Sequence, residues 1–322
     1  MTTHISLKAA VPEVLSGNRL DQIAAKLFPE YSRARLQGWI KDGSLLVNSR
    51  ILRPKDKLAA GDFIEIEAAM VANETWLAEP IKLDIVFEDE HLLVLNKGVN
   101  MVVHPAAGNR EGTLLNGLLH YYPALSELPR AGIVHRLDKD TTGLMVVAKT
   151  LPVHTGLVQL LQARNITREY EAVVKGVLTG GGTVDQPIGR HAFNRKRRAV
   201  TESGQYAVTH YRVIEKFRAF THVQVNLETG RTHQIRVHMA YVNHPILGDP
   251  VYGGRLQIPA ACSPDLASYL QSFRRQALHA RKLALLHPVS NKEMQWEVSR
   301  PQDMQKLLEL LTADNKAKKV AV

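Results

Sequence analysis

Apolar and polar positions near the start of the chain follow two different spacings. Apolar residues first recur at helical spacing, and Pro29 ends that helix because proline cannot continue it. Ser32 is a candidate N-cap for a second helix. Short strands are expected over residues 44–48 and 63–67, and in the second of them apolar residues alternate with acids. Residues 1–16 are typical of a loose lead-in strand, so the pattern predicts a compact unit of two helices and small strands.

Further along the chain, apolar runs predict strands more often than helices. Strands are expected over residues 85–87, 92–95, 144–147, 168–176, 208–213 and 221–227, and helices over residues 151–162, after a cap at Thr232, and over residues 307–311. The strands outnumber the helices and do not alternate with them in regular units. We therefore expect mixed or antiparallel pairing and an α+β fold.

A weakly periodic stretch that ends at Pro80 marks a linker between two parts of the chain. We expect a small domain over residues 16–75, a larger domain over residues 81–312, and a disordered basic tail over residues 313–322. A chain of 322 residues is long enough for two such domains.

The composition narrows the kinds of partner and compartment. A formal charge of +10 and a pI of about 9.6 favour a polyanionic partner, with nucleic acid ahead of a membrane surface. Cys262 is the single cysteine, so neither an internal disulfide framework nor a zinc site built on cysteines can form. No apolar stretch approaches the ~18 residues of a membrane span, and the first residues lack the apolar core of a signal peptide. We therefore expect a cytoplasmic protein.

The strongest candidate for chemistry is Asp138, in the polar loop directly before the expected strand over residues 144–147. Arg136 and Lys139 flank it, and neighbouring cations favour the charged form of a carboxylate. A weak surface ion pair is the ordinary role of such an aspartate. Its position at the mouth of a buried strand favours a functional role instead, because rigid scaffolds carry functional groups on such loops.

The same loop resembles the signature loop of RNA pseudouridine synthases that modify large-subunit ribosomal RNA. The segments His135–Asp138 and Thr141–Leu144, His-Arg-Leu-Asp and Thr-Thr-Gly-Leu, carry this resemblance. In that family the aspartate of the loop is the catalytic residue, so the resemblance implies this role for Asp138. Thr142 departs from the serine that is usual in the family but keeps a hydroxyl.

Two later stretches resemble the same family independently. The segment Leu227–His238 contains Gln-Ile-Arg, and the family's arginine that pairs with the catalytic aspartate maps to Arg236. An Arg-Glu-Tyr stretch maps the family's active-site tyrosine to Tyr170. Further substrate-binding candidates come from the first and third stretches: His135, Arg136, Thr142, Arg231, His233 and Gln234.

The reaction that this resemblance implies explains the residue types. Conversion of uridine to pseudouridine breaks the bond from ribose to the base nitrogen and rejoins the ribose to carbon 5, so it requires neither metal nor cofactor. A carboxylate beside the anomeric carbon acts as nucleophile or as base, and the sequence leaves both roles open for Asp138. A guanidinium such as that of Arg236 keeps the carboxylate ionised. Tyr170 offers a platform for the detached base, and its hydroxyl is a candidate to help remove the proton from carbon 5. Because the uridine must be flipped out of the RNA, Arg136 is a candidate to occupy the space that the base vacates.

Basic residues outside these stretches predict an RNA-docking surface. Residues 33–57 hold seven cations against two acids, in a unit that resembles the small RNA-binding fold of a small-subunit ribosomal protein and of many RNA-modifying enzymes. Residues 190–198 form a second basic run that contains no acid. The docking candidates in the two runs are Arg33, Arg35, Lys41, Arg53, Arg195, Lys196 and Arg197. The implied partner is 23S large-subunit ribosomal RNA or the pre-50S particle, and we expect a monomer.

Other interpretations of the sequence are weaker. His233 and His238 lie five residues apart, on different faces of a helix, so a metal site is not expected. The glycine-rich segment 248–254 follows no strand-to-helix phosphate pattern and is expected to be a turn. A non-catalytic RNA-binding assembly factor needs no carboxylate that faces a polyanion. A glycoside hydrolase requires a second carboxylate near Asp138, for which Asp140 is the nearby candidate.

Overall fold

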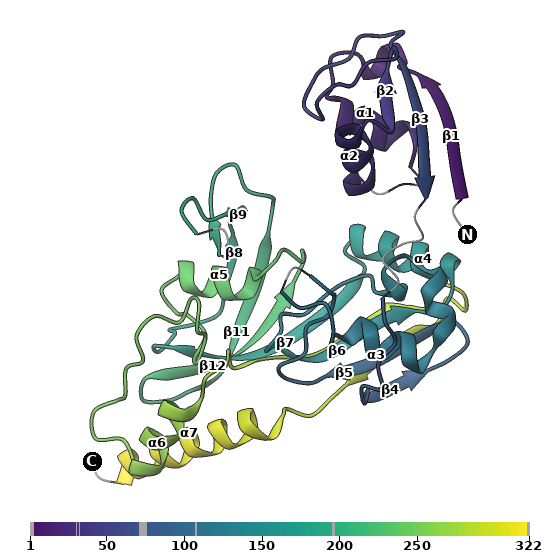
Figure 1. Ribbon diagram of the computed structural model, residues 1–322. Coiled ribbons are helices and arrows are strands. Elements are labelled where there is room, and N and C mark those ends of the chain that lie inside the picture. The colour runs from purple at the N-terminus through teal and green to yellow at the C-terminus, as the bar shows by residue number, and fades with distance from the viewer. Residues whose placement is uncertain are drawn as a thin grey trace. The chain divides into compact units, whose positions relative to one another are not determined.

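The computed structural model describes residues 3–29, 31, 33–70, 76–106, 108–194 and 197–320 of the chain. Contacts divide the chain into two units, Met1–Thr75 and Trp76–Val322, and each has its own apolar core (Figure 1). The expected N-cap Ser32, the docking candidates Arg195 and Lys196, and part of the expected linker lie outside the described residues. None of the described helices is long and apolar enough to span a membrane.

The small unit is a three-stranded antiparallel sheet with two helices. The strands pair in the order β1-β3-β2, with bounds Thr3–Ala10 for β1, Leu45–Val47 for β2 and Phe63–Met70 for β3. The helices are α1, Leu20–Leu27, and α2, Arg33–Asp42, and they follow a short 3-10 turn, η1, at Glu13–Leu15. These helices and the strands β2 and β3 lie where the apolar spacing predicts them.

Strand β1 corrects the expected start of the small domain. The lead-in segment is not loose, because β1 pairs along its whole length with β3, with Ile5 opposite Ala68 and Leu7 opposite Ile66. Ile5 and Ala68 are also part of the apolar core of this unit. The small unit therefore begins before residue 16.

The large unit is built on one nine-stranded mixed sheet (Figure 1). The strands pair in the order β4-β5-β6-β13-β7-β12-β11-β8, and β14 pairs with β13. Their bounds are β4 Ile85–Glu88, β5 Leu92–Lys97, β6 Thr142–Ala148, β7 Ile166–Lys175, β8 Gly182–Asp185, β11 Val208–Lys216, β12 Phe220–Leu227, β13 Leu278–Leu286 and β14 Glu293–Glu297. Strands β6 and β13 run parallel and the other pairs antiparallel, which confirms the expected α+β class. Strands β9, Ile188–Arg190, and β10, Arg198–Val200, form a separate hairpin.

Helices and short turns cover this sheet. Their bounds are α3 Leu114–Tyr121, η2 Pro123–Glu127, η3 Pro129–Gly132, α4 Leu151–Gln162, α5 Gln234–Tyr241, α6 Pro264–Ser272 and α7 Gln302–Val320. The expectation of a short helix followed by a disordered tail is wrong as far as Val320, because α7 continues to that residue. Leu307 and Leu311 anchor this helix in the core, and Asp314 accepts a hydrogen bond from the amide N–H of Ser263 at 2.9 Å.

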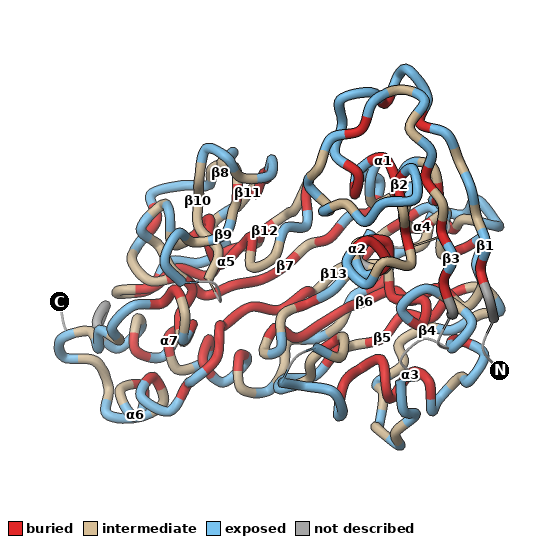
Figure 2. Tube along the Cα trace, turned by 45° about the horizontal axis from the view of Figure 1, so that its top comes forward, coloured by how far each residue is buried: buried red, intermediate tan, exposed pale blue. Residues whose placement is uncertain are grey.

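The centre of the sheet is buried on both faces, as the unbroken apolar run of β6 requires. Met145 and Val147 of β6 belong to the main core, whereas Leu144 and Val146 belong to a second core on the other side. Figure 2 shows buried residues along β5, β6, β7 and β13. The ends of these strands are therefore rigid supports for the loops that they carry.

Gly143 sets the position of the loop before β6. It has φ +114, and a Cβ atom at this residue would lie 2.1 Å from the carbonyl oxygen of Ala280 on β13. Glycine is therefore needed for the close parallel approach of β6 and β13. This contact fixes the strand directly after the loop that contains Asp138.

Candidate active site

The loop before β6, strand β7 and the start of α5 surround a cavity of about 590 Å³. Asp138 is the single carboxylate residue among the described residues that line it. Five arginines share the lining: Arg130, Arg136, Arg168, Arg231 and Arg236. A concave site with this excess of positive charge suits an anionic substrate such as RNA.

The Asp138 carboxylate faces two residues from α5 and the segment before it. Its Oδ2 atom accepts a hydrogen bond from the NH1 group of Arg236 at 2.8 Å. Its Oδ1 atom lies 3.8 Å from Nε2 of His233. The Asp138 carbonyl accepts the amide N–H of Thr141 at 3.1 Å, which closes the loop into a turn. The structure thus brings Asp138 and Arg236 together as the sequence predicts.

A buried aspartate that the sequence interpretation missed orients Arg236. Asp249 accepts hydrogen bonds from Nε and NH2 of Arg236 at 2.7 and 2.9 Å. Burial alone would lower the pKa of Arg236, but the hydrogen bonds and charges of Asp249 and Asp138 outweigh it and raise that pKa. The backbone N–H groups of Val251 and Tyr252 also donate to Asp249. The glycine-rich segment 248–254 is therefore a turn, as expected, but it carries a residue that supports the site.

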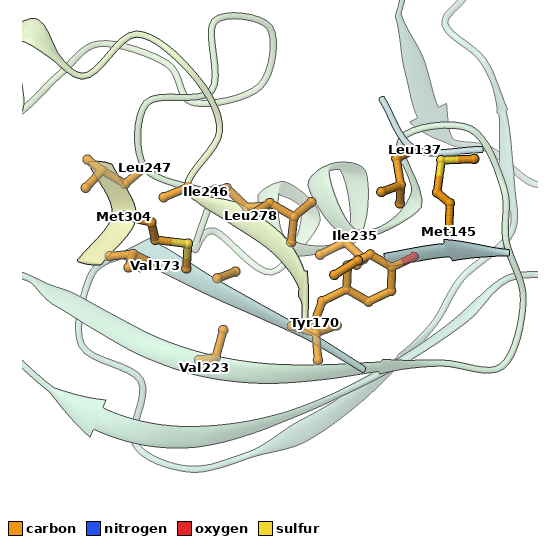
Figure 3. Packing of buried hydrophobic residues seen from close by; sticks show 14 of the residues in the cluster. Leu137, Met145, Tyr170, Val173, Val223, Ile235, Ile246, Leu247, Leu278 and Met304 are labelled. Carbon is orange, nitrogen blue, oxygen red and sulfur yellow. The ribbon is translucent and has the colours of Figure 1, made fainter. Parts of the chain in front are cut away.

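Tyr170 lies on β7 with its ring between the apolar core and the cavity. It is 6% exposed, belongs to the main core and also lines the cavity. Figure 3 shows its ring rising from β7 beside Ile235, with the hydroxyl oxygen on the side of Leu137 and Met145. Burial raises the pKa of the Tyr170 hydroxyl, so it stays protonated at neutral pH. An apolar ring face at a cavity wall is suited to stacking against a base.

Lys97 holds the backbone of the Asp138 loop through hydrogen bonds, a role that the sequence did not indicate. Its side chain is buried, and Nζ donates to the carbonyl oxygens of Gly98, Met101 and Lys139 at 2.8, 3.0 and 2.9 Å. Burial lowers the pKa of Lys97 to about 8, against the opposing charges of Asp140 and Asp138. The Lys139 carbonyl directly follows Asp138, so this ammonium group fixes the backbone next to the carboxylate.

His233 begins helix α5 in a left-handed conformation. Its φ is +60, and it occupies the N-cap position, so the expectation that Thr232 caps this helix is wrong. Nδ1 of His233 lies 2.8 Å from the hydroxyl of Tyr252, and burial lowers the pKa of His233. The ring is therefore neutral at neutral pH and faces Asp138 as a polar neighbour.

The two histidines considered for a metal face different partners. His238 is buried, with Nδ1 2.8 Å from the Thr209 hydroxyl and Nε2 2.9 Å from the Gln186 carbonyl. His233 is turned toward Tyr252 and Asp138. In the described part of the chain, no group of three or more His, Cys, Asp or Glu residues is placed to hold a metal ion.

Three of the expected substrate-binding residues make hydrogen bonds within the scaffold, and two of them, His135 and Gln234, also line the cavity. The buried Thr142 hydroxyl lies 2.9 Å from Nδ1 of His279 and is not part of the cavity lining. His135 reaches the lining, but its Nε2 accepts the amide N–H of Val146, and burial lowers the pKa of His135 to about 3. Gln234 is 3% exposed and hydrogen-bonds groups on β11 and in the loop before α5.

Besides His233, two further expected substrate-binding residues reach the cavity from its rim. Arg136 is exposed and lines the cavity next to Asp138. Arg231 also lines it, and its Nε donates to the Tyr206 carbonyl at 3.0 Å. Both guanidinium groups are therefore placed to meet a substrate that enters the cavity.

The docking candidates differ in how much of their charge is used within the protein. Arg33 forms an ion pair with the buried Asp21 at 2.5 Å, and Arg53 pairs with Asp56 at 3.2 Å. Lys41 is exposed. Arg35 is half-buried and has a partner within the chain. The guanidinium of Arg197 lies over the ring of Tyr252, 5.3 Å from its centroid. The small unit thus offers fewer unpaired cations than its sequence suggests.

Comparison with protein families accounts for both units. A family model described as RNA pseudouridylate synthase matches residues 91–241, which include Asp138, Tyr170 and Arg236. A family model described as S4 domain matches residues 18–64 of the small unit. The expected RNA-binding fold of the small unit and the expected catalytic domain are thereby confirmed.

Similar proteins match nearly the whole chain. The ribosomal large subunit pseudouridine synthase D of Pseudomonas aeruginosa is 57% identical over 317 residues, which cover 98% of this chain and 99% of that protein. The protein of the same name from Escherichia coli strain K12 is 54% identical over 315 residues, with 98% and 97% covered. The solved structure of human RNA pseudouridylate synthase domain containing 4 is 25% identical, has a TM-score of 0.55, and covers 71% of this chain and 93% of that chain. These findings confirm the resemblance seen in the signature loop, and the chain belongs to the RNA pseudouridine synthase family.

Proposed function

We propose that this enzyme isomerises specific uridines of 23S large-subunit ribosomal RNA through the carboxylate of Asp138. The observation that supports this most strongly is the 2.8 Å hydrogen bond between Arg236 and Asp138 in a cavity that five arginines also line. The relatives from Pseudomonas aeruginosa and Escherichia coli bear names that specify the ribosomal large subunit. A net charge of +10 agrees with a large RNA or a ribosomal precursor as the partner. The same substrate favours a cytoplasmic location.

The reaction rearranges bonds within one nucleotide. The C1′–N1 bond breaks and leaves its electron pair on the base, the base turns, and C5 bonds to C1′. The C5 proton is then lost and N1 gains one, so nothing is oxidised or released. Asp138 acts either as the nucleophile at C1′ or as a base toward the sugar, and both roles require its ionised form. Arg236 places a fixed positive charge 2.8 Å from that carboxylate.

The surrounding residues divide the remaining tasks. A uridine within folded RNA must be flipped out to reach Asp138, and the exposed Arg136 beside it is placed to fill the vacated space. The detached base stacks on the Tyr170 ring. Because burial raises the pKa of the Tyr170 hydroxyl, the group is protonated at neutral pH and presents no phenolate to take the C5 proton, which favours the platform role.

The cavity argues against the two alternative functions. A glycoside hydrolase needs a second carboxylate near the first, but Asp138 is the single acid among the described lining residues and Asp140 does not line the cavity. Asp249 is buried and fully engaged with Arg236. A pure RNA binder has no use for an ionised carboxylate in a cationic cavity, where it repels phosphate. An isomerase that requires one carboxylate fits both observations.

Pseudouridine mapping across total ribosomal RNA tests the proposal. RNA from cells with and without this gene is compared, and the deletion strain is complemented with the wild-type gene or with Asp138→Asn. Loss of defined pseudouridines from large-subunit RNA is expected on deletion, with restoration by the wild type alone. An unchanged large-subunit map, or losses confined to other RNAs, would contradict the assigned substrate.

A further inference from the structure

Arg168 on β7 is a buried cation without a carboxylate partner among the described residues. Three arginines are buried in the described part of the chain, and two of them are neutralised: Arg236 by two aspartates and Arg275 by Asp303, at 2.6 and 2.7 Å. Arg168 is 8% exposed, and its guanidinium makes one long hydrogen bond, 3.4 Å from NH2 to the carbonyl of Glu228. Its buried Nε atom has no partner among the described residues.

A buried charged group of this kind lowers the stability of the fold unless acceptors or a counter-charge satisfy it. A guanidinium carries five N–H donors and is always charged, and burial without a counter-charge removes its hydration without compensation. The fold supplies carboxylates both to Arg275, which serves the scaffold, and to Arg236, which serves the site. The unused donors of Arg168 therefore point to an acceptor that the described residues do not provide.

The position of Arg168 identifies where that acceptor lies. Arg168 and Tyr170 are two residues apart on β7, so their side chains share one face, and both line the cavity. The charge of Arg168 is close enough to act on two neighbours. It lowers the pKa of Tyr170, which burial raises, and it adds to the effect of burial in lowering the pKa of His135. A Cβ atom at Gly230 would lie 2.7 Å from NH1 of Arg168, so the absence of a side chain there leaves room for the guanidinium in the cavity wall.

We propose that Arg168 hydrogen-bonds the uracil base and stabilises the negative charge that the base carries while it is detached from ribose. This inference rests on the proposed function. When the C1′–N1 bond breaks, its electron pair goes to N1 and spreads to the carbonyl oxygens of the ring. An N–H group of Arg168 donates to one of these oxygens while the ring stacks on Tyr170. The charge disappears when C5 bonds to C1′, and the later loss of the C5 proton is balanced by the proton that N1 gains. The interaction is therefore strongest around the transition state.

The base is a better acceptor for Arg168 than a phosphate group. Arg168 is almost fully buried beside the aromatic platform, whereas Arg136 at the same cavity is exposed. Backbone phosphates remain at the entrance when a single nucleotide is flipped into a pocket, because the base leads. Exposed cations such as Arg136 therefore serve the phosphates, and the buried Arg168 serves the base.

Single-turnover kinetics at saturating large-subunit RNA test this role, with RNA affinity measured over a range of salt concentrations. Arg168→Gln should slow isomerisation about 100-fold or more, as removal of one preorganised donor does elsewhere, with unchanged affinity and salt slope. Arg168→Lys keeps the charge and should recover part of the rate. Arg212→Gln is the matched control, because Arg212 is an exposed cation on the neighbouring part of the sheet that donates to Gln224 and does not line the cavity.

A double-mutant cycle with Gly230→Ala makes the test independent of any folding defect in one variant. The added methyl group displaces the Arg168 guanidinium without removing its charge, so Gly230→Ala should also slow the reaction. The double variant should be no slower than Arg168→Gln alone, because both changes act through one guanidinium. Thermal melting checks that the variants are folded, and Arg168→Lys and Gly230→Ala carry the test if Arg168→Gln is not.

Three results would overturn the assignment. If Arg168 contacts a phosphate, Arg168→Gln should instead bind RNA more weakly, with a salt slope smaller by close to one unit and an unchanged rate at saturation. Unchanged rates in all folded variants would make Arg168 a structural cation. A wild-type protein that does not convert uridine would refute the proposed function itself, and the role of Arg168 with it, whereas an active wild type with active Arg168 variants refutes only the latter.

Discussion

Asp249 holds Arg236 through two nitrogen atoms of one guanidinium, with distances of 2.7 Å to Nε and 2.9 Å to NH2. The remaining nitrogen, NH1, is thereby aimed at Asp138, 2.8 Å away. A planar guanidinium with two fixed bonds has little freedom to rotate. Asp249 therefore determines the direction from which positive charge reaches the carboxylate of Asp138.

Replacement of Asp249 by asparagine should impair the reaction although Asp249 does not face the substrate. The amide of the new side chain would hold Arg236 with one acceptor instead of two, and misplacement of a reacting group by about 1 Å costs on the order of 100-fold in rate. We expect Asp249→Asn to lower the single-turnover rate at saturating RNA by about 10- to 100-fold, with little change in RNA affinity. Asp314→Asn is the control, because it weakens the pair of this buried carboxylate with Arg218, 3.1 Å apart, and neither residue lines the cavity. Equal rates for the two variants would show that Asp249 has no special role.

A second buried carboxylate next to Tyr170 predicts a defined loss of stability in acid. Glu171 is fully buried and pairs with His222 at 3.1 Å, with Arg281 at 2.5 Å and with Arg300. Burial alone would raise the pKa of Glu171, but these hydrogen bonds and charges lower it well below its ordinary value. A carboxylate with a lowered pKa in the folded state contributes stability above its unfolded pKa of about 4.3, and that stability is lost as the pH falls.

The free energy of unfolding of the wild type should therefore fall steeply below about pH 5. Glu171→Gln removes the titrating group, so the free energy of unfolding of this variant should fall less steeply with pH than that of the wild type. The two slopes should differ by up to about 1.4 kcal/mol per pH unit. At pH 7 the same variant should be less stable by about 3 kcal/mol, because two arginines lose their buried counter-charge. Glu169→Gln, a half-buried carboxylate on the same strand, is the matched control. Identical acid profiles for Glu171→Gln and the wild type would contradict this account.

Parts of the fold with a local apolar signature are predictable from the sequence, and the strand β13 shows why others are not. Strands β5 and β6 and helix α4 stand out because their own residues are mostly apolar. Strand β13 lies at the centre of the sheet, but it carries His279, Arg281 and Lys282. Its charges are neutralised by residues remote in sequence, such as Glu171 with Arg281. A strand whose polar groups find partners only in the folded protein gives no local signal.

The same reasoning explains the candidate site. Asp138, Tyr170 and Arg236 lie in stretches that resemble family motifs, and all three line one cavity. Asp249 and Lys97 act through hydrogen bonds to residues distant along the chain. The local sequence, a glycine-rich turn around Asp249 and the end of strand β5 at Lys97, does not mark either residue as part of the site. Motif resemblance also does not separate contact with substrate from support, which is why Thr142 lies within the motif but outside the cavity lining.

The small unit should contribute affinity rather than chemistry. A protein that begins at Trp76 keeps the whole large unit, its cavity and its separate core. It should bind large-subunit RNA more weakly and with a shallower salt dependence, because each lost phosphate contact removes close to one unit from the slope. The rate at saturating RNA should change much less. Unchanged affinity and salt slope would show that the basic residues of the small unit only contact solvent. Loss of turnover at saturating RNA would instead assign the small unit a part in the active site.

Isomerisation should survive removal of metal ions from the protein. The described residues contain no cluster of ligands for a metal, and the proposed chemistry uses only a carboxylate and its neighbours. The protein is treated with EDTA, freed of the chelator and added to RNA that was folded separately with magnesium, because magnesium also folds the substrate. Full activity is expected. Activity that is lost and then restored by zinc would reverse the assignment of His233 and His238 as non-ligands.

The central claim, that the Asp138 carboxylate performs the chemistry, is tested most directly by the single-turnover rate of Asp138→Asn at saturating large-subunit RNA. Asparagine keeps the size of the side chain but cannot act as the nucleophile or as the base. Asp140→Asn is the control, because Asp140 lies two residues away and does not line the cavity. The account predicts undetectable pseudouridine formation by Asp138→Asn, with RNA affinity preserved and Asp140→Asn active. A rate for Asp138→Asn within tenfold of the wild type, about 1.4 kcal/mol in the barrier, would contradict it.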